Sequence, residues 1–292
     1  MASPLSVVVE RGELVESAHR VHVVAVDDGE VVEAAGDSEL VVWIRSVAKP
    51  IQALPLTREE PDLPQAELAI ACASHQATGE QMALVEALLA RSGSTEADLE
   101  CGPIKGRKVA HNCSGKHAAM LLRTKLHGWR LPGYRLPEHP VQREAARLVA
   151  DAADASEVPE ATDGCGVVTF ALPLRALAAM YARLARRELA GADRVVSAMV
   201  AHPDLVGGPT AADTAIMRAS PGVVAKRGAE GVLCAGLPDG RGVALKVEDG
   251  ASRATGPALA RFLGLAELEE APVLNSREEL VGRIRAGRLR VM

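Results

Sequence analysis

Short apolar runs rich in β-branched residues open the chain and predict a meander of strands. The runs cover residues 6–10, 21–26, 30–34 and 40–44. β-branched residues suit a pleated sheet, and Asp28-Gly29 between two of the runs is a strong hairpin signal. The first 45 residues are therefore expected to form short strands joined by tight turns.

From Lys49 to about residue 205 the apolar positions recur at helical spacing. Amphipathic stretches cover residues 81–90, 117–126, 141–150, 173–189 and 194–201. Thr78 and Gln81 have the spacing of a capping box, and Ser92-Gly93 marks the end of the helix that follows it. This part of the chain is expected to be helical.

Strands return near the C-terminus. Residues 231–236 and 243–248 are apolar and flank a turn rich in Gly, Pro and Asp, which predicts a hairpin. A helix is expected at 254–263, and the basic residues 277–292 are expected to be partly helical or extended. The order of elements predicts an α+β fold in one domain, 1–292. Its sheet comes from both termini (about 1–48 and 220–292) and packs against a large helical part (about 49–219).

Composition narrows the classes of function. The 292 residues carry a net charge of −5 and only two Trp, two Tyr and two Phe, which disfavours a nucleic-acid partner. No apolar run approaches ~18 residues, so no membrane span is predicted. The five cysteines are odd in number and scattered, and the N-terminus lacks the pattern of a secretory signal. These features predict reduced thiols or metal ligands in a cytoplasmic protein.

Ser46 and Lys49 lie three residues apart where a strand is expected to give way to a helix. At this spacing both side chains share one face, and a neutral amine can take the proton of a hydroxyl. The neighbouring Arg45 could lower the pKa of the amine or bind a carboxylate. Pro50 disfavours helical geometry at Lys49, so the helix is expected to begin near Lys49. A cap with a solvated lysine is the other interpretation of the same pattern.

The densest polar cluster is His111-Asn-Cys113-Ser-Gly-Lys116-His117, at the start of an expected helix. The helix start favours anions, so Cys113 could be an activated thiol. It could also be a metal ligand together with His111, Lys116 or His117, or simply a buried cysteine at a cap. A second thiol, Cys165, lies between two glycines, and two thiols alone fall short of the four ligands of a structural zinc site.

Two further candidates are less specific. Ser74 and His75 follow an apolar run and precede a probable helix start. Lys246 alternates with apolar residues in an expected strand and therefore points towards solvent or a cleft on the sheet. Neither a P-loop nor a dinucleotide-binding glycine motif is present, so no nucleotide cofactor is indicated.

Taken together, the motifs resemble a known family. They occur in this order: Arg45-Ser46-Val-Ala-Lys49-Pro, Ala73-Ser74-His75, His111-Asn-Cys113-Ser-Gly-Lys116-His117, Asp163-Gly-Cys165-Gly and His202-Pro-Asp-Leu-Val-Gly-Gly. From about residue 5 to 270 the chain is similar to the L-asparaginase II family, the Rhizobium etli type. The resemblance implies a fold like that of serine β-lactamases and class A glutaminases. It also implies hydrolysis of L-asparagine to L-aspartate and ammonia, and a homodimer.

The resemblance also assigns roles to residues. It implies that Ser46 is the nucleophile with Lys49 as its base, and that Ser74 and Lys246 form a second serine–lysine pair. It implies a zinc ion held by Cys113, Lys116, Cys165 and a water. The residues implied near the substrate are Asp163, Arg45 and His117, with Cys234 close to the site.

Alternatives to an asparaginase remain at this point. Another serine–lysine amidohydrolase, such as a glutaminase or a β-lactam or peptide hydrolase, would use the same residues. A hydrolase with Cys113 as its nucleophile is a third reading. A non-catalytic amino-acid-binding protein on the same fold belongs to a different class. Zinc content and the effects of Ser46→Ala and Cys113→Ala separate these possibilities.

Overall fold

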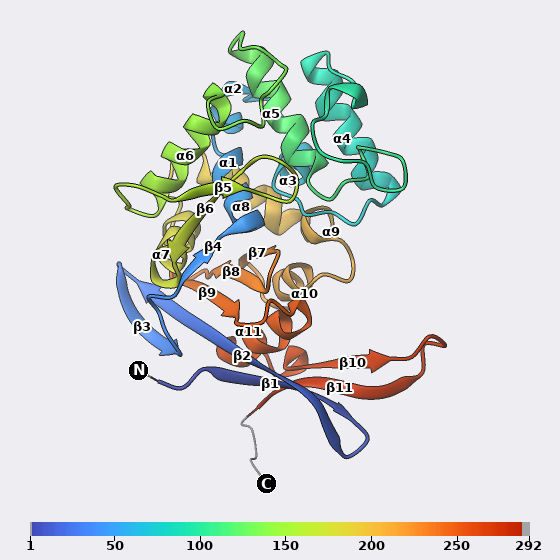
Figure 1. Ribbon diagram of the computed structural model, residues 1–292. Helices are drawn as coiled ribbons and strands as arrows, with labels where there is room; N and C mark the ends of the chain where they lie inside the picture. The colour runs from blue at the N-terminus through green and yellow to red at the C-terminus, as the bar shows by residue number, and fades with distance from the viewer. Residues whose placement is uncertain (1, 288–292) are drawn as a thin grey trace.

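The computed structural model describes residues 2–287; the remaining residues, 1 and 288–292, lie outside the described part of the chain. Figure 1 shows an antiparallel sheet below a helical region. The strands of this sheet are β1 (Leu5–Arg11), β2 (Leu14–Asp27), β3 (Glu30–Ala35), β7 (Val224–Gly228), β8 (Val232–Gly236), β9 (Gly242–Val247), β10 (Glu270–Leu274) and β11 (Leu280–Gly287). The α+β layout with a sheet built from both ends of the chain is confirmed.

The order of strands is β10-β11-β1-β2-β9-β8-β7, with β3 also paired to β2. The long strand β2 joins the two ends of the chain, because it pairs with β1 and β3 and also with β9. The predicted turn at Asp28-Gly29 closes the β2–β3 hairpin, and both residues have positive φ, 47° and 81°. The predicted hairpin of β8 and β9 is also present. Part of 277–292 is strand β11, and 288–292 lie outside the described residues.

Helices fill the middle of the chain, and one more lies between β9 and β10. They are α1 (Lys49–Ala53), α2 (Leu56–Glu59), α3 (Gln65–Ala71), α4 (Gly79–Ser92), α5 (Ser114–Leu126), α6 (Pro140–Ala152), α7 (Leu174–Ala185), α8 (Ala192–Ala201), α9 (Pro203–Gly207), α10 (Ala212–Ala219) and α11 (Thr255–Leu263). Short 3₁₀ helices are η1 (Arg45–Ala48), η2 (Glu96–Asp98), η3 (Ser252–Ala254) and η4 (Ala266–Leu268). None of the described helices combines the length and the apolar character needed to cross a membrane.

The capping signals of α4 are confirmed. The Thr78 side chain accepts a hydrogen bond from the backbone of Gln81, and the Gln81 side chain accepts one from the backbone of Thr78. Gly93 ends the helix with a φ of 66°, a left-handed conformation that glycine adopts without strain.

A small sheet pairs the strand expected at 40–44 with two strands from the region expected to be helical. It has the order β4-β6-β5, from β4 (Val41–Trp43), β5 (Glu160–Thr162) and β6 (Val168–Pro173). A short apolar run such as 167–171 fits a buried strand or a buried helix equally well, so periodicity did not identify β6.

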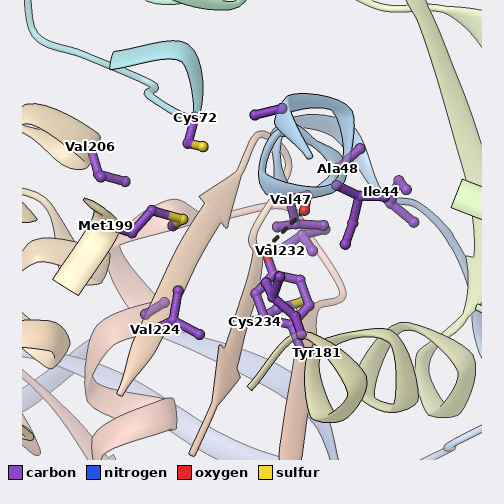
Figure 2. Packing of buried hydrophobic residues seen from close by; sticks show 14 of the residues in the cluster. Ile44, Val47, Ala48, Cys72, Tyr181, Met199, Val206, Val224, Val232 and Cys234 are labelled. Atoms are coloured by element: carbon purple, nitrogen blue, oxygen red, sulfur yellow. Dashed lines mark hydrogen bonds between the residues drawn. The ribbon is translucent and has the colours of Figure 1, made fainter. Parts of the chain in front are cut away.

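Helix α7 packs directly on the large sheet. A Cβ added at Gly242 would lie 1.9 Å from the carbonyl oxygen of Ala178, so only glycine permits this contact. The Tyr181 hydroxyl donates to the carbonyl of Val47, at 2.9 Å, within the packed core (Figure 2). The bond crosses from α7 to η1 and fixes the segment that carries Ser46 against the sheet.

Candidate active site

The segment Arg45–Ala48 lies where β4 meets the first helices. Arg45 has a φ of 51°, an unusual conformation for a residue with a side chain. The backbone of Ile44 is held by the carbonyl of Phe170, at 2.8 Å, and the Val47 amide donates back to Ile44, at 3.2 Å. This turn places Ser46, which is 8% exposed, at the entrance to α1. The helix begins at Lys49 with Pro50 in its first turn, as the sequence predicts.

Lys49 is buried, at 1% exposure, and its amine contacts the segment that follows α3. The Lys49 Nζ donates to the carbonyl of Ala73, at 2.5 Å, and to the Ser74 Oγ, at 3.0 Å. Ser74 is held in turn, because its amide donates to the carbonyl of Val206, at 2.8 Å. The structure thus pairs Lys49 with Ser74.

The pKa of Lys49 is lowered from its usual value. Burial is the main cause, because it penalises the charged amine, and the nearby Lys116 ammonium adds to it. The Cys113 thiolate acts in the opposite direction, through its charge and through a hydrogen bond with the amine. A buried amine of lowered pKa beside a hydroxyl is the arrangement that proton abstraction requires.

The polar cluster at the start of α5 gathers two thiols and an amine. Lys116 Nζ lies 3.3 Å from Cys165 Sγ, which lies 3.7 Å from the Asp163 carboxylate. A hydrogen bond with Cys165 and the charges of Lys49 and Lys116 hold the pKa of Cys113 well below its usual range, against the effect of burial. The Cys113–Cys165 pair therefore favours one thiolate, at Cys113.

Lys116 remains charged in this surrounding. Burial disfavours its ammonium, but Cys165, Cys113 and Asp163 outweigh that effect and raise its pKa. Together the three side chains predicted as zinc ligands lie in one cluster.

The spacing of two of these donor atoms is compatible with a zinc ion between them. Zinc bound to a sulfur and a nitrogen at its ordinary bond lengths separates the two atoms by about 3.5 Å, close to the 3.3 Å between Lys116 and Cys165. Within residues 2–287 no group of three or more His, Cys, Asp or Glu side chains is arranged to hold a metal. The predicted set has only two donors of those types, since its third is an amine that must lose its proton to bind.

Arg45 and Asp163 form an ion pair at the edge of the thiol cluster. Arg45 Nε lies 2.6 Å from Asp163 Oδ1, and the Gly164 amide donates to the same oxygen, at 2.8 Å. Burial would raise the pKa of Asp163, but Lys116 and Arg45 outweigh it and lower that pKa. The cation of the pair is the neighbour of Ser46 in the chain, and the anion lies two positions before Cys165.

His117 is fully buried behind Lys116. Its Nδ1 lies 2.6 Å from the hydroxyl of Tyr134, which also accepts the Glu100 amide, at 2.9 Å. Its Nε2 is buried and has no hydrogen-bond partner within residues 2–287. Burial lowers the pKa of His117 well below its usual value, so the ring is neutral near pH 7.

His75 has its own fixed role. Its Nδ1 accepts the Ala77 amide, at 3.1 Å, so its Nε2 carries the proton and donates to Ser114, at 2.8 Å. Burial lowers the pKa of His75 to about 4. The ring therefore ties the segment after α3 to the first turn of α5.

The structure does not bring Lys246 to this cluster. Its amine donates to the carbonyl of Val247, and the charged groups acting on it are Glu230, Asp249 and Glu248. The alternation of β9 predicted the face on which Lys246 lies but not the direction in which its long side chain runs.

A different lysine, Lys226 of β7, lies beside the site. It is 0% exposed and its amine donates to Asp213, at 3.2 Å, and to the carbonyl of Arg227, at 2.9 Å. Burial, Lys49 and Arg227 lower its pKa to about 8, although Asp213 opposes them. The sequence did not predict it, because Lys226 and Arg227 interrupt the apolar pattern by which strand 224–228 would have been recognised.

Strand β7 reaches the Arg45–Ala48 segment at Gly228. A Cβ added there would lie 3.1 Å from the carbonyl oxygen of Ile44 and 3.4 Å from the Cβ of Arg45. Cys234, which the resemblance placed close to the site, is buried in β8 directly opposite Lys226. Burial raises its pKa well above the usual value, so it is an unreactive thiol within the sheet.

The chain belongs to the L-asparaginase II family, whose sequence profile matches residues 7–288. A search of curated proteins found no match.

Several solved structures are similar to this chain at low identity. A protein described as Mglu in its native form is 17% identical, with a TM-score of 0.48, over 84% of this chain and 63% of Mglu. A β-lactamase from Mycobacterium bovis is 13% identical, with a TM-score of 0.45, over 83% and 94% of the two chains. A probable glutaminase from Bacillus subtilis, complexed with 6-diazo-5-oxo-L-norleucine, is 15% identical, with a TM-score of 0.40, over 85% and 84%. The chain spans less than two thirds of Mglu.

Proposed function

We propose that this protein hydrolyses L-asparagine to L-aspartate and ammonia through a serine nucleophile activated by lysine. The observation that carries the proposal is the Lys49 amine, buried, lowered in pKa and bonded to Ser74, one helical turn after Ser46. Membership of the L-asparaginase II family supports the choice of substrate.

The hydrogen bonds of Lys49 suit a general base. As a neutral amine it has two hydrogens, which the Ala73 carbonyl and the Ser74 hydroxyl accept. Its lone pair would take the Ser46 proton as the Ser46 oxygen attacks the side-chain amide carbon. The same proton passes to the leaving nitrogen, ammonia departs, and water releases aspartate from the ester.

The charges around Ser46 suit a small zwitterion. Arg45 can bind the α-carboxylate and Asp163 the α-ammonium, exchanging their mutual ion pair for pairs with the substrate. The buried Nε2 of His117 needs a polar partner, which a substrate oxygen or a water can supply.

We also propose that Cys113, Lys116 and Cys165 hold a zinc ion, with a water as the fourth ligand. Zinc would act as a Lewis acid and a positive charge that organises the polar groups beside it. Cys113, whose pKa is lowered, would be one of the zinc ligands. A thiolate bound to zinc is not free to attack a substrate, so this proposal excludes Cys113 as the nucleophile. Zinc content measured on the purified protein and on Cys165→Ser tests the ligand set.

The first experiment is ammonia release from L-asparagine and L-glutamine by the wild type, Ser46→Ala and Cys113→Ala. Activity on asparagine that vanishes in Ser46→Ala supports the proposal, and activity that survives in it rejects Ser46 as the nucleophile. Faster release from glutamine than from asparagine would make the protein a glutaminase. Tight binding of asparagine without ammonia release would indicate a binding protein.

The homodimer and the cytoplasmic location stay predictions. Light scattering on the purified protein tests the dimer. Fractionation of cells that express the protein tests the location.

A further inference from the structure

A buried carboxylate beside the site has no role in the mechanism above. Asp213 of α10 is 0% exposed. Its Oδ2 accepts from the Lys226 amine, at 3.2 Å, and from the Arg227 amide, at 3.0 Å. Its Oδ1 lies 3.3 Å from Arg227 Nε and accepts the amide of Thr214, at 3.2 Å. One carboxylate therefore holds two neighbouring cations of the edge strand β7.

Arg227 carries this interaction to the serine that Lys49 binds. Its Nη2 donates to the carbonyl of Ser74, at 2.8 Å, and to the carbonyl of Gly207, at 2.9 Å. The Ser74 amide is fixed on the other side by Val206. The Ser74 backbone is thus held at both ends, and its hydroxyl faces Lys49 as a result.

The surrounding chain leaves room for the carboxylate. A Cβ added at Gly207 would lie 2.4 Å from Asp213 Oδ1, so a side chain at this position would displace Asp213. Removing one partner of a buried ion pair leaves an uncompensated charge, whereas apolar replacement of the whole pair is often neutral for stability. Stability alone therefore does not explain a buried carboxylate shared by two cations at this position.

We propose that Asp213 is a positioning residue of the active site. It fixes Lys226 and Arg227 on β7, and through Arg227 it keeps the Ser74 hydroxyl on the Lys49 amine. The effect on turnover rests on the proposed function, whereas the effect on Lys226 does not.

The variant that tests this is Asp213→Asn, which keeps the shape and one oxygen but removes the charge. Asp204→Asn is the matched control, because Asp204 forms a surface ion pair with Arg218, at 2.6 Å, next to the same helix. We expect kcat to fall about 10- to 100-fold in Asp213→Asn with KM nearly unchanged, since the substrate does not touch this residue. Asp204→Asn should match the wild type.

The second readout is the titration of Lys226, followed by NMR of labelled lysine and assigned with Lys226→Met. The charged and titratable groups that face Lys226 are Asp213, Arg227, Lys49, Cys72 and Cys234. Removing the only carboxylate among them disfavours the ammonium, so the pKa should fall from about 8 by roughly one unit or more. This shift reports the contact between Asp213 and Lys226, whereas the fall in kcat at unchanged KM in a folded variant separates positioning from a purely structural role.

Arg227→Lys tests the same proposal if Asp213→Asn does not fold. Lysine retains the positive charge but lacks the planar fork that spans both carbonyls, so kcat should fall about 10-fold or more. Wild-type kcat in a folded Asp213→Asn or in Arg227→Lys would overturn the proposal. An unchanged Lys226 titration in Asp213→Asn would also overturn it. If the wild type releases no ammonia, the proposed function is rejected. The titration of Lys226 still tests whether Asp213 fixes Lys226 on β7.

Discussion

The Lys49 amine lies 3.0 Å from the hydroxyl of Ser74, a residue 25 positions further along the chain. The sequence placed Lys49 with Ser46, three positions before it, because both were expected on one helical face. In the structure the amine reaches into the segment after α3, where it also binds the Ala73 carbonyl. This relationship leads to the first prediction.

Lys49→Arg should lose at least about 100-fold in kcat. Arginine keeps the positive charge and the hydrogen-bonding capacity, but it does not give up its proton near neutral pH and so cannot act as a base. Ammonia release from L-asparagine measures the effect. Lys125→Arg, on the exposed end of α5, is the control and should match the wild type. Substantial activity in Lys49→Arg would exclude Lys49 as the base.

Asp163→Asn should weaken substrate binding more than it slows turnover. Asp163 is proposed to bind the α-ammonium of asparagine, and a hydrogen bond to a charged group contributes enough for a rise in KM of about 10- to 100-fold. Steady-state kinetics measures KM and kcat separately. The control is Asp239→Asn, which removes a carboxylate from an exposed pair with Arg241. Unchanged KM in Asp163→Asn would place the ammonium elsewhere.

Gly115→Ala should disturb the thiol cluster. A Cβ at Gly115 would lie 2.1 Å from the carbonyl oxygen of Ile70, so α5 must move away from α3. We expect a loss of about 1–3 kcal/mol in the free energy of unfolding, together with lower zinc content. Chemical denaturation and metal analysis measure the two effects.

Gly79→Ala is the matched control for that substitution. Gly79 also lies in the first turn of a helix, but a Cβ there meets nothing within 4 Å. Alanine at this site should leave the stability unchanged or raise it slightly. A Gly115→Ala variant as stable as Gly79→Ala would contradict the tight packing of α5 on α3.

The ion pairs of Glu59 should make stability depend on acid pH. Burial would raise the pKa of Glu59, but Arg123 and His127 outweigh it and lower that pKa below 4.5. A carboxyl whose pKa is lower in the folded state stabilises the fold above its unfolded pKa. That contribution is lost as the pH falls through the folded pKa.

Denaturation curves between pH 3 and 7 test this. Glu59→Gln should be less stable than the wild type at pH 7, and the difference should shrink as the pH falls below about 4.5. Glu39→Gln, in the exposed pair with Arg175, should change stability by less than about 1 kcal/mol at every pH. A constant difference between Glu59→Gln and the wild type would contradict the prediction.

Local signals predicted most of the fold. The Asp28-Gly29 turn, the capping box of Thr78 and the helix start at Lys49 each depend on residues within a few positions of one another. Their physical causes, a positive φ, a cap and a proline in the first turn, are properties of the chain itself. Strand β6 was missed because a short apolar run has no period of its own.

Several parts of the site were also visible in the sequence. The resemblance named Cys113, Lys116 and Cys165, and the structure brings Lys116 next to Cys165. Asp163 and Arg45, named for the substrate, form an ion pair. The roles of these residues, and the zinc, stay proposals that the experiments above test.

The sequence by itself determined the α+β class, the helix boundaries that caps and glycines mark, and the side chains that carry chemistry. Only the tertiary structure decided which of those side chains meet. Lys226 rather than Lys246 lies beside the site, since β7 is the strand whose Gly228 reaches Ile44. The order of strands and the approach of Ser74 to Lys49 depend on contacts between residues far apart in the chain, which no local pattern encodes.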